Sequence, residues 1–226
     1  MSGLRKTENS IDKRTILIAE SFMEGVKWLF FDIGSTLVDE TKVYDDIFHK
    51  IAIAANVSDE YVKTQAIEFY KQNKRGHKEV MRLLGVDYPE WTPEYEELYP
   101  DTIKCLQALE KKYKLGIIAN QIPGAEKRLE NKGIRQYFDL IISSAEEGVA
   151  KPDLQIFRLA LTRAGCAPEQ AVMIGDRIDN DIVPAKQMGM KTVRIRQGVG
   201  QYWNIQGDCE TPDMEVNSLS ELLSIF

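Results

Sequence analysis

From residue 99 onward the chain alternates between short apolar runs and amphipathic segments. This spacing predicts strands at residues 115–119, 140–142, 171–174 and 192–195, and helices at residues 102–113, 125–132, 154–164 and 181–188. One more apolar run, at residues 28–31, precedes the series and predicts the first strand. Repeated strand–helix units form a parallel sheet with helices on both faces. The sequence therefore predicts an α/β protein with a Rossmann-like, doubly wound parallel sheet.

A helical block interrupts this series after the first strand. Residues 41–84 carry apolar positions at helical spacing, and Pro89 and Pro93 mark a loop after them. Because adjacent strands need no connection of that length, we expect an inserted α-helical cap domain. The predicted organisation is an N-terminal extension at residues 1–22, a core at 23–40 and 98–226, and a cap at 41–97. A short closing helix is expected at residues 218–226.

Composition excludes several classes of protein. The net charge of −6 over 226 residues argues against a broad nucleic-acid surface. No apolar run approaches the roughly 20 residues that cross a bilayer, and the run at residues 15–19 is too short for a signal peptide. Cys105, Cys166 and Cys209 lack metal-ligand spacing and indicate reduced thiols. We expect a cytoplasmic protein that binds neither nucleic acid nor membrane, as a monomer or a homodimer.

Polar residues follow the predicted strands at one edge of the sheet. They are Asp32, Asn120, Lys151, Asp176 and Asp181. The carboxyl ends of parallel strands meet at one edge, where ligands bind in open α/β sheets, so these groups can converge. Carboxylate oxygens suit Mg²⁺, and a lysine beside them adds a second positive charge for an anionic phosphate. Taken alone, Asp32 could equally be a helix cap or a turn residue.

Four motifs resemble those of the haloacid dehalogenase-like hydrolase superfamily, and the resemblance covers about residue 26 to the end. They are residues 32–37 (DIGSTL), 117–120 (IIAN), 151–153 (KPD) and 175–181 (GDRIDND). The resemblance implies that Asp32 is a nucleophile that forms an aspartyl phosphate. It also implies that Mg²⁺ is held by the carboxylates of Asp32 and Asp176 and the main-chain carbonyl of Gly34. Asp181 would contribute directly or through water, and Lys151 would neutralise charge on Asp32 and on the phosphate.

Two positions depart from the family pattern. Family phosphatases carry an aspartate at position 34 that protonates the leaving oxygen and later activates water, and Gly34 cannot do this. Such acid–base catalysis typically raises the reaction rate about 10²–10⁴-fold. Family members usually carry a hydroxyl group at position 119 that donates a hydrogen bond to the phosphate. A hydrogen bond to a charged group contributes on the order of 1.5–3 kcal/mol. Ala119 leaves only its main chain, with Asn120, for the phosphate. The departures predict weak or unusual phosphatase activity.

The missing acid and the substrate contacts have candidates near the first motif and in the cap. His77, Asp39 and Glu40 are candidate replacements for the absent aspartate. In the segment 73–78 a glycine lies among cations, so Arg75, Gly76 and His77 are expected to contact a small phosphorylated substrate. A solvated turn with ordinary surface charge is the alternative for this segment.

The functional prediction is a Mg²⁺-dependent phosphatase that acts on a small phosphorylated metabolite through Asp32. Gly34 and Ala119 favour one alternative, a catalytically impaired binding or regulatory protein. A second alternative is a hydrolase of the dehalogenase or phosphonatase type. The Gly175-Asp176 pair favours a metal and a phosphorus centre over a carbon–halogen bond. Cleavage of a phosphonate would need a cap lysine, for which the candidates are Lys63, Lys71, Lys74 and Lys78.

Overall fold

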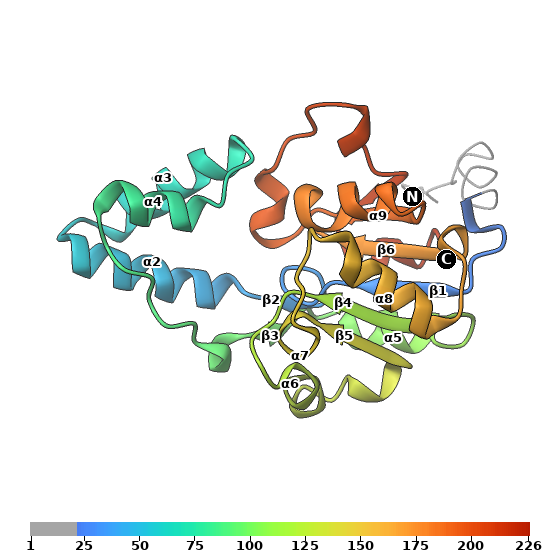
Figure 1. The fold of residues 1–226 in the computed structure, drawn as a ribbon. Helices are drawn as coiled ribbons and strands as arrows, with labels where there is room; N and C mark the ends of the chain where they lie inside the picture. Colours follow the sequence, from blue (N-terminus) through green and yellow to red (C-terminus); the bar gives the residue numbers. More distant parts are fainter. Residues whose placement is uncertain (1–21) are drawn as a thin grey trace, which may run out of the picture.

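Six parallel strands form the centre of the computed structural model, which describes residues 22–226 (Figure 1). They are β1 (Trp28–Phe31), β4 (Lys114–Ala119), β5 (Leu140–Ser143), β6 (Ala171–Gly175), β7 (Lys191–Ile195) and β8 (Met214–Val216). The strand order is β5-β4-β1-β6-β7-β8. At the end of β1, Phe31 lies opposite Ile117 of β4 and Ile174 of β6. The first strand is therefore central, and the residue that follows it leaves the sheet near its middle.

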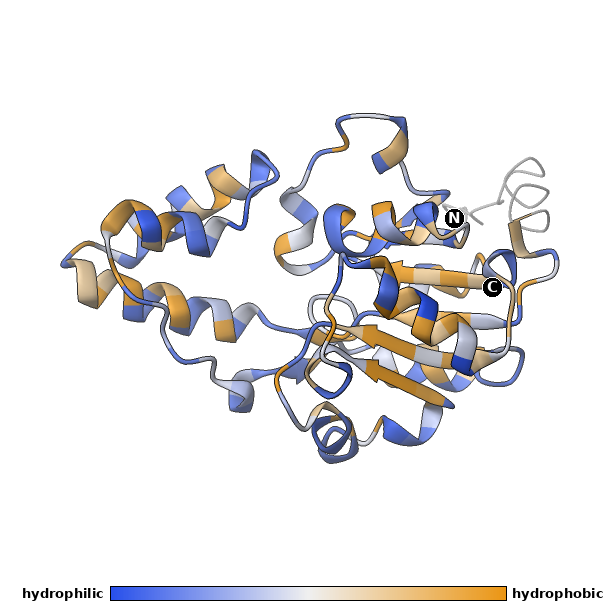
Figure 2. Ribbon diagram, viewed as in Figure 1, coloured by the Kyte–Doolittle hydropathy of each residue, from blue (hydrophilic) through white to orange (hydrophobic). Residues whose placement is uncertain are grey.

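Helices cover both faces of this sheet. They are α5 (Thr102–Leu109), α6 (Ala125–Asn131), α7 (Ser144–Glu147), α8 (Leu154–Ala164), α9 (Val183–Gln187) and α10 (Leu219–Leu222). Successive residues of a strand point to opposite faces. Leu29 and Phe31 accordingly join one buried cluster, and Phe30 joins the other with Phe157 of α8. The strands are apolar along most of their length (Figure 2), as burial on both faces requires. The predicted α/β, Rossmann-like sheet is confirmed.

Three helices follow the first strand and lie beside the sheet at its carboxyl edge (Figure 1). They are α2 (Thr41–Ala55), α3 (Asp59–Lys71) and α4 (Gly76–Leu84). Their apolar faces form a cluster of their own, which includes Ile47, Val62 and Val80 and also Ile178 and Trp203 from the segments after β6 and β7. The chain leaves and returns through a two-stranded antiparallel ribbon of β2 (Val38–Asp39) and β3 (Glu97–Leu98).

Several boundaries differ from the sequence expectations. The helix expected at 102–113 ends at Leu109, and it buries Thr102, Cys105, Leu106 and Leu109. The closing helix spans only Leu219–Leu222, and β8 was not predicted. A π-helical turn, Ile178–Ile182, precedes α9 where one continuous helix was expected. The expected N-terminal extension lies, except for residue 22, outside the described residues. Within residues 22–226, the helices are too short or too polar to cross a membrane.

Candidate active site

Three aspartates converge where two neighbouring strands end. Asp32 follows β1, Asp176 follows β6, and Asp181 lies in the π-helical turn. One carboxylate oxygen from each lies within 4.8 Å of the others. A Cβ atom at Gly175 would come 2.4 Å from the Asp181 carboxyl carbon, so only glycine lets this carboxylate approach the end of β6. Adjacent parallel strands and one tight turn thus bring together the carboxylates that the sequence predicted.

Lys151 is the cation at the centre of this cluster. Its Nζ donates hydrogen bonds to Asp32 Oδ1 at 2.8 Å and to Asp181 Oδ1 at 2.5 Å. The side-chain amide of Asn120 fixes the lysine backbone: its Nδ2 donates to the Lys151 carbonyl at 2.8 Å, and its Oδ1 accepts from the Lys151 N–H at 2.7 Å. Asn120 therefore positions Lys151, a contact that the sequence pattern does not reveal.

The cluster carries more buried negative than positive charge. Burial raises the pKa of Asp176 well above its usual range, and the carboxylates of Asp181 and Asp32 add to the shift. Burial alone would lower the pKa of Lys151, but the same Asp181 and Asp32 carboxylates raise it. Buried charges of like sign are costly unless a counter-ion compensates them. Hard carboxylate oxygens in such a cluster fit a divalent cation such as Mg²⁺.

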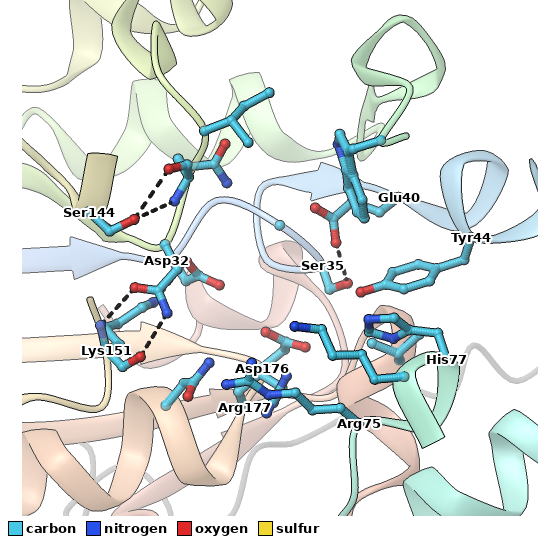
Figure 3. Close-up of a pocket in the computed structure, with 18 of the residues that line it drawn as sticks. Asp32, Ser35, Glu40, Tyr44, Arg75, His77, Ser144, Lys151, Asp176 and Arg177 are labelled. Atoms are coloured by element: carbon cyan, nitrogen blue, oxygen red, sulfur yellow. Dashed lines mark hydrogen bonds and ion pairs between the residues drawn. The ribbon is translucent and has the colours of Figure 1, made fainter. Parts of the chain in front are cut away.

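A cavity of about 450 Å³ opens above these groups (Figure 3). Its core side includes Asp32, Gly34, Asn120, Lys151, Asp176 and Arg177. The rest of its lining comes from the start of α2, the start of α4 and the segment after α4: Glu40, Tyr44, Arg75, His77, Lys78, Tyr88, Trp91 and Glu96. Lys78 belongs to the segment 73–78 that the sequence offered for substrate contact, whereas Arg177 lies within the motif 175–181 and was given no role there. Arg177 forms a two-point ion pair with Asp179 and stacks 4.3 Å from the Trp203 ring.

Two residues expected at the substrate do not line the cavity. Ala119 is fully buried at the end of β4. Gly76 opens α4, so it does not lie in a loop, and a Cβ atom there would lie 2.1 Å from the Ala66 carbonyl oxygen. Gly76 is therefore explained by the close packing of α4 on α3. Arg75 and His77, its neighbours, do line the cavity.

His77 lines the cavity in a neutral state. Its side chain is buried, with Nδ1 2.7 Å from the Tyr70 hydroxyl oxygen. Burial lowers the pKa of His77 to about 3, and the nearby cations Lys78, Arg177 and Arg75 act in the same direction. An imidazole with this pKa carries no extra proton at neutral pH. The suggestion that His77 replaces the missing acid is therefore disfavoured.

Glu40 and Asp39 lie in different surroundings although they are adjacent in the chain. Asp39 Oδ1 accepts a hydrogen bond from the Thr41 N–H at 2.9 Å, and Asp39 does not line the cavity. Glu40 is buried and lines the cavity, and its Oε2 accepts a hydrogen bond from the Ser35 hydroxyl at 3.2 Å (Figure 3). Burial raises the pKa of Glu40 to about 8, and the Asp32 and Glu96 carboxylates add to the shift.

Comparison with known proteins identifies the class of protein. A family model described as haloacid dehalogenase-like hydrolase matches residues 26–189. The chain belongs to this family of hydrolases, which confirms the resemblance seen in the four motifs.

Relatives match most of the chain. It is 30% identical over 225 residues to a glyceraldehyde 3-phosphate phosphatase of Methanopyrus kandleri, with 88% of this chain and 97% of that protein covered. It is 31% identical over 228 residues to a protein of the same name from Pyrococcus furiosus, with coverage of 90% and 94%. A crystal structure of a phosphatase of this family from Thermococcus onnurineus is 27% identical, with a TM-score of 0.60 and coverage of 88% and 97%.

Proposed function

We propose that this hydrolase is a Mg²⁺-dependent phosphatase that acts on a small phosphorylated metabolite through Asp32. The observation that carries the proposal is the buried cluster of Asp32, Asp176 and Asp181 around Lys151, directly below a cavity of about 450 Å³. A cavity of this size accommodates a small ligand. The excess of buried carboxylates fits a site that holds both a cation and a phosphate.

Each residue has a defined part in this reaction. The Asp32 carboxylate attacks phosphorus, while the Lys151 ammonium group, 2.8 Å from Asp32 Oδ1, holds the nucleophile and offsets charge on the phosphate. Mg²⁺ would be held by the carboxylates of Asp32 and Asp176 and the main-chain carbonyl of Gly34, with Asp181 contributing directly or through water. When bound, it supplies positive charge that reduces repulsion between the carboxylate and the anionic phosphate.

Glyceraldehyde 3-phosphate is the first substrate to test. The relatives from Methanopyrus kandleri and Pyrococcus furiosus are named as phosphatases of this compound, and their matches cover nearly the whole chain. A three-carbon phosphate is also small enough for the cavity. We infer that the substrate is a triose phosphate or a molecule of similar size.

Two cap-side cations favour a second candidate, a phosphorylated carboxylic acid. Arg75 and Lys78 both line the cavity, and within residues 22–226 neither has an acidic partner. A carboxylate on the far end of the substrate would pair with them. Comparison of glyceraldehyde 3-phosphate with 3-phosphoglycerate distinguishes the candidates: Arg75→Ala should raise KM more for the acid than for the aldehyde if the acid is the true substrate.

We also propose that residues 41–97 act as a cap that closes over the site. Three helices of this segment share an apolar cluster, and the β2–β3 ribbon joins the segment to the core. Closure would exclude water and bring the cap residues to the substrate.

The test is phosphate release from glyceraldehyde 3-phosphate and from p-nitrophenyl phosphate, with and without Mg²⁺. We expect release from wild type that EDTA abolishes and that Asp32→Asn lowers to background. Asp39→Asn is the matched control, because this carboxylate lies outside the cavity, and it should retain activity. Metal-dependent ligand binding without any release would instead support the binding or regulatory protein.

A phosphonate-cleaving reaction is tested separately. Three of the four candidate cap lysines donate hydrogen bonds elsewhere: Lys63 to Asp45, Lys71 to Glu68 and Lys74 to Gln72. The fourth, Lys78, lines the cavity. Lys78 would be the amine of a Schiff base. Borohydride reduction in the presence of phosphonoacetaldehyde should leave the mass of the protein unchanged if the enzyme is a phosphatase, and an adduct on Lys78 would support the alternative.

A further inference from the structure

The space beside Gly34 is filled by another carboxyl group. A Cβ atom built on Gly34 would lie 2.3 Å from Glu40 Oε1, 2.7 Å from Glu40 Cδ and 2.8 Å from Glu40 Oε2. Carbon and oxygen atoms that are not bonded cannot approach so closely. A side chain at position 34 and the present Glu40 carboxyl therefore exclude each other, and the position-34 side chain would start where the Glu40 carboxyl now lies.

The surroundings of Glu40 give it no evident structural role. The residue is 8% exposed, and within the described part of the chain its side chain has no cationic partner and a single hydrogen bond, from Ser35. Burial of a carboxyl group with so little compensation costs stability. Its main-chain carbonyl accepts from the Tyr44 N–H at the start of α2, a contact that any residue would provide.

Glu40 also faces the reacting groups. It lines the same cavity as Asp32, Gly34 and Lys151. Figure 3 shows its carboxyl next to Ser35, with Asp32 across the same space. The Ser35 hydroxyl in turn lies against the backbone of Gly198, where a Cβ atom would come 2.2 Å from Ser35 Oγ. Ser35 and Glu40 are thus held as a pair at the cavity wall.

We propose that Glu40 is the catalytic acid–base of this enzyme, and that its carboxyl replaces the side chain missing at position 34. This inference rests on the phosphatase function proposed above. In the first step a bond forms between an Asp32 oxygen and phosphorus, the bond from phosphorus to the leaving oxygen breaks, and the Glu40 carboxyl gives that oxygen its proton. In the second step the Glu40 carboxylate takes a proton from water as the water oxygen bonds to phosphorus. The bond to Asp32 then breaks, and both carboxyl groups return to their starting states.

The first experiment compares Glu40→Gln with wild type on two substrates. Glutamine keeps the size of the side chain but cannot transfer the proton. With β-glycerol phosphate, whose leaving alkoxide needs a proton, we expect kcat/KM to fall about 10²–10⁴-fold. With p-nitrophenyl phosphate, whose leaving group is stable as an anion, we expect a smaller decrease in the rate of the first step. A burst of about one p-nitrophenol per site should then precede slow turnover, because water is no longer activated.

Asp39→Asn is the matched control for this experiment. It neutralises the adjacent carboxylate, which lies outside the cavity, and an amide oxygen can still accept the hydrogen bond from the Thr41 N–H. It should show wild-type rates on both substrates and no burst.

The second experiment moves the carboxyl group back to position 34. Gly34→Asp alone should displace the Glu40 carboxyl, which is the flexible end of its side chain, from this space. The double variant Gly34→Asp/Glu40→Ala removes the collision and supplies a carboxyl in the same space. We expect it to hydrolyse β-glycerol phosphate at least tenfold faster than Glu40→Ala does.

The outcomes separate this inference from the proposed function. If wild type is active and Asp32→Asn is inactive, but Glu40→Gln matches wild type on both substrates, the phosphatase function stands and the role of Glu40 is wrong. An equal loss on both substrates without a burst, and no gain in the double variant, would make Glu40 merely structural and overturn the inference. If wild type releases no phosphate, the proposed function fails and this inference fails with it.

Discussion

At the scale of single residues, burial decides which groups around the cavity can carry charge. His77 and Glu40 line the same cavity, and burial favours the neutral form of each, which lowers the pKa of the imidazole and raises that of the carboxyl. At neutral pH the histidine has therefore lost its extra proton, while the glutamic acid keeps its own. Of these two groups, only Glu40 has a proton available for a leaving group.

The neutral state of His77 predicts a pH dependence of stability. The pKa is about 3 in the folded protein and about 6.5 in the unfolded chain, so the unfolded state binds the proton more readily. The stability that His77 contributes is present above pH 6.5 and is lost as the pH falls. Between pH 7 and pH 5, wild type should lose about 2 kcal/mol of unfolding free energy more than His77→Gln does. Urea unfolding at the two pH values measures this difference, and parallel losses in both proteins would contradict it.

The residues of the proposed active site differ in how far the sequence predicts them. Asp32, Asp176 and Lys151 follow recognisable strands or motifs, and parallel strand ends meet at one edge, so their convergence could be predicted. The place of Glu40 depends instead on the path of the turn from residue 33 to 39, which no periodicity encodes. The sequence named Glu40 only as one of three candidates, and the space beside Gly34 distinguishes it from the others.

At the scale of elements, the loop between α3 and α4 is joined to the core by paired amides. Asn73 Nδ2 donates to the Asn204 carbonyl at 2.7 Å, and Asn73 Oδ1 accepts from the Asn204 N–H at 2.8 Å. Asn204 Nδ2 donates to the Lys71 carbonyl at 2.8 Å. These bonds join the loop between α3 and α4 to the loop after β7, so they would favour closure of the proposed cap.

Removal of the Asn73 amide should loosen the proposed cap. Asn73 has a φ of 58°, a conformation that glycine adopts without strain, so Asn73→Gly removes the amide with little effect on the backbone. We expect a loss of about 1 kcal/mol of closing free energy, which is about a fivefold rise in KM, and faster amide exchange at residues 71–76. Asn56→Gly is the control, since Asn56 has a φ of 53° at the end of α2 and makes no such bond to the core. Equal effects in both variants would show that the amide pair does not hold the cap.

Elements marked by an apolar run or a cap were predicted closely, and the shortest strands were not predicted. β1, β4 and α8 begin and end within a residue of their expected positions because apolar runs and Asp153, which caps α8, define them. β8 has three residues, and β2 and β3 have two each, too few to show a period of two. Their existence depends on pairing with distant strands, which the local sequence does not contain.

At the scale of the whole molecule, there are two apolar clusters on the sheet and a third in the inserted helices. The charged cluster of Asp32, Asp176 and Asp181 with Lys151 is separate from all three. Without a cation the carboxylates repel one another, and this repulsion lowers the stability of the folded state. The same repulsion provides the free energy with which the site would bind a divalent cation.

Mg²⁺ should therefore raise the melting temperature. A ligand at 100 times its dissociation constant adds about 2.7 kcal/mol, which corresponds to about 5–10 °C for a domain of this size. Asp176→Asn should melt higher than wild type in EDTA, since it relieves repulsion, and should gain little from Mg²⁺. A thermal shift with Mg²⁺ that is equal in Asp176→Asn and wild type would place the cation elsewhere.

Attack of Asp32 on phosphorus is tested most directly by rapid acid quenching of the enzyme during turnover of glyceraldehyde 3-phosphate with Mg²⁺, followed by mass spectrometry of the peptide that contains residue 32. We expect a phosphoryl adduct on Asp32 in wild type, more of it in Glu40→Gln, and none in Asp32→Asn. Turnover that proceeds with no adduct on Asp32 in wild type or Glu40→Gln, or an adduct on another residue, would show that Asp32 is not the nucleophile.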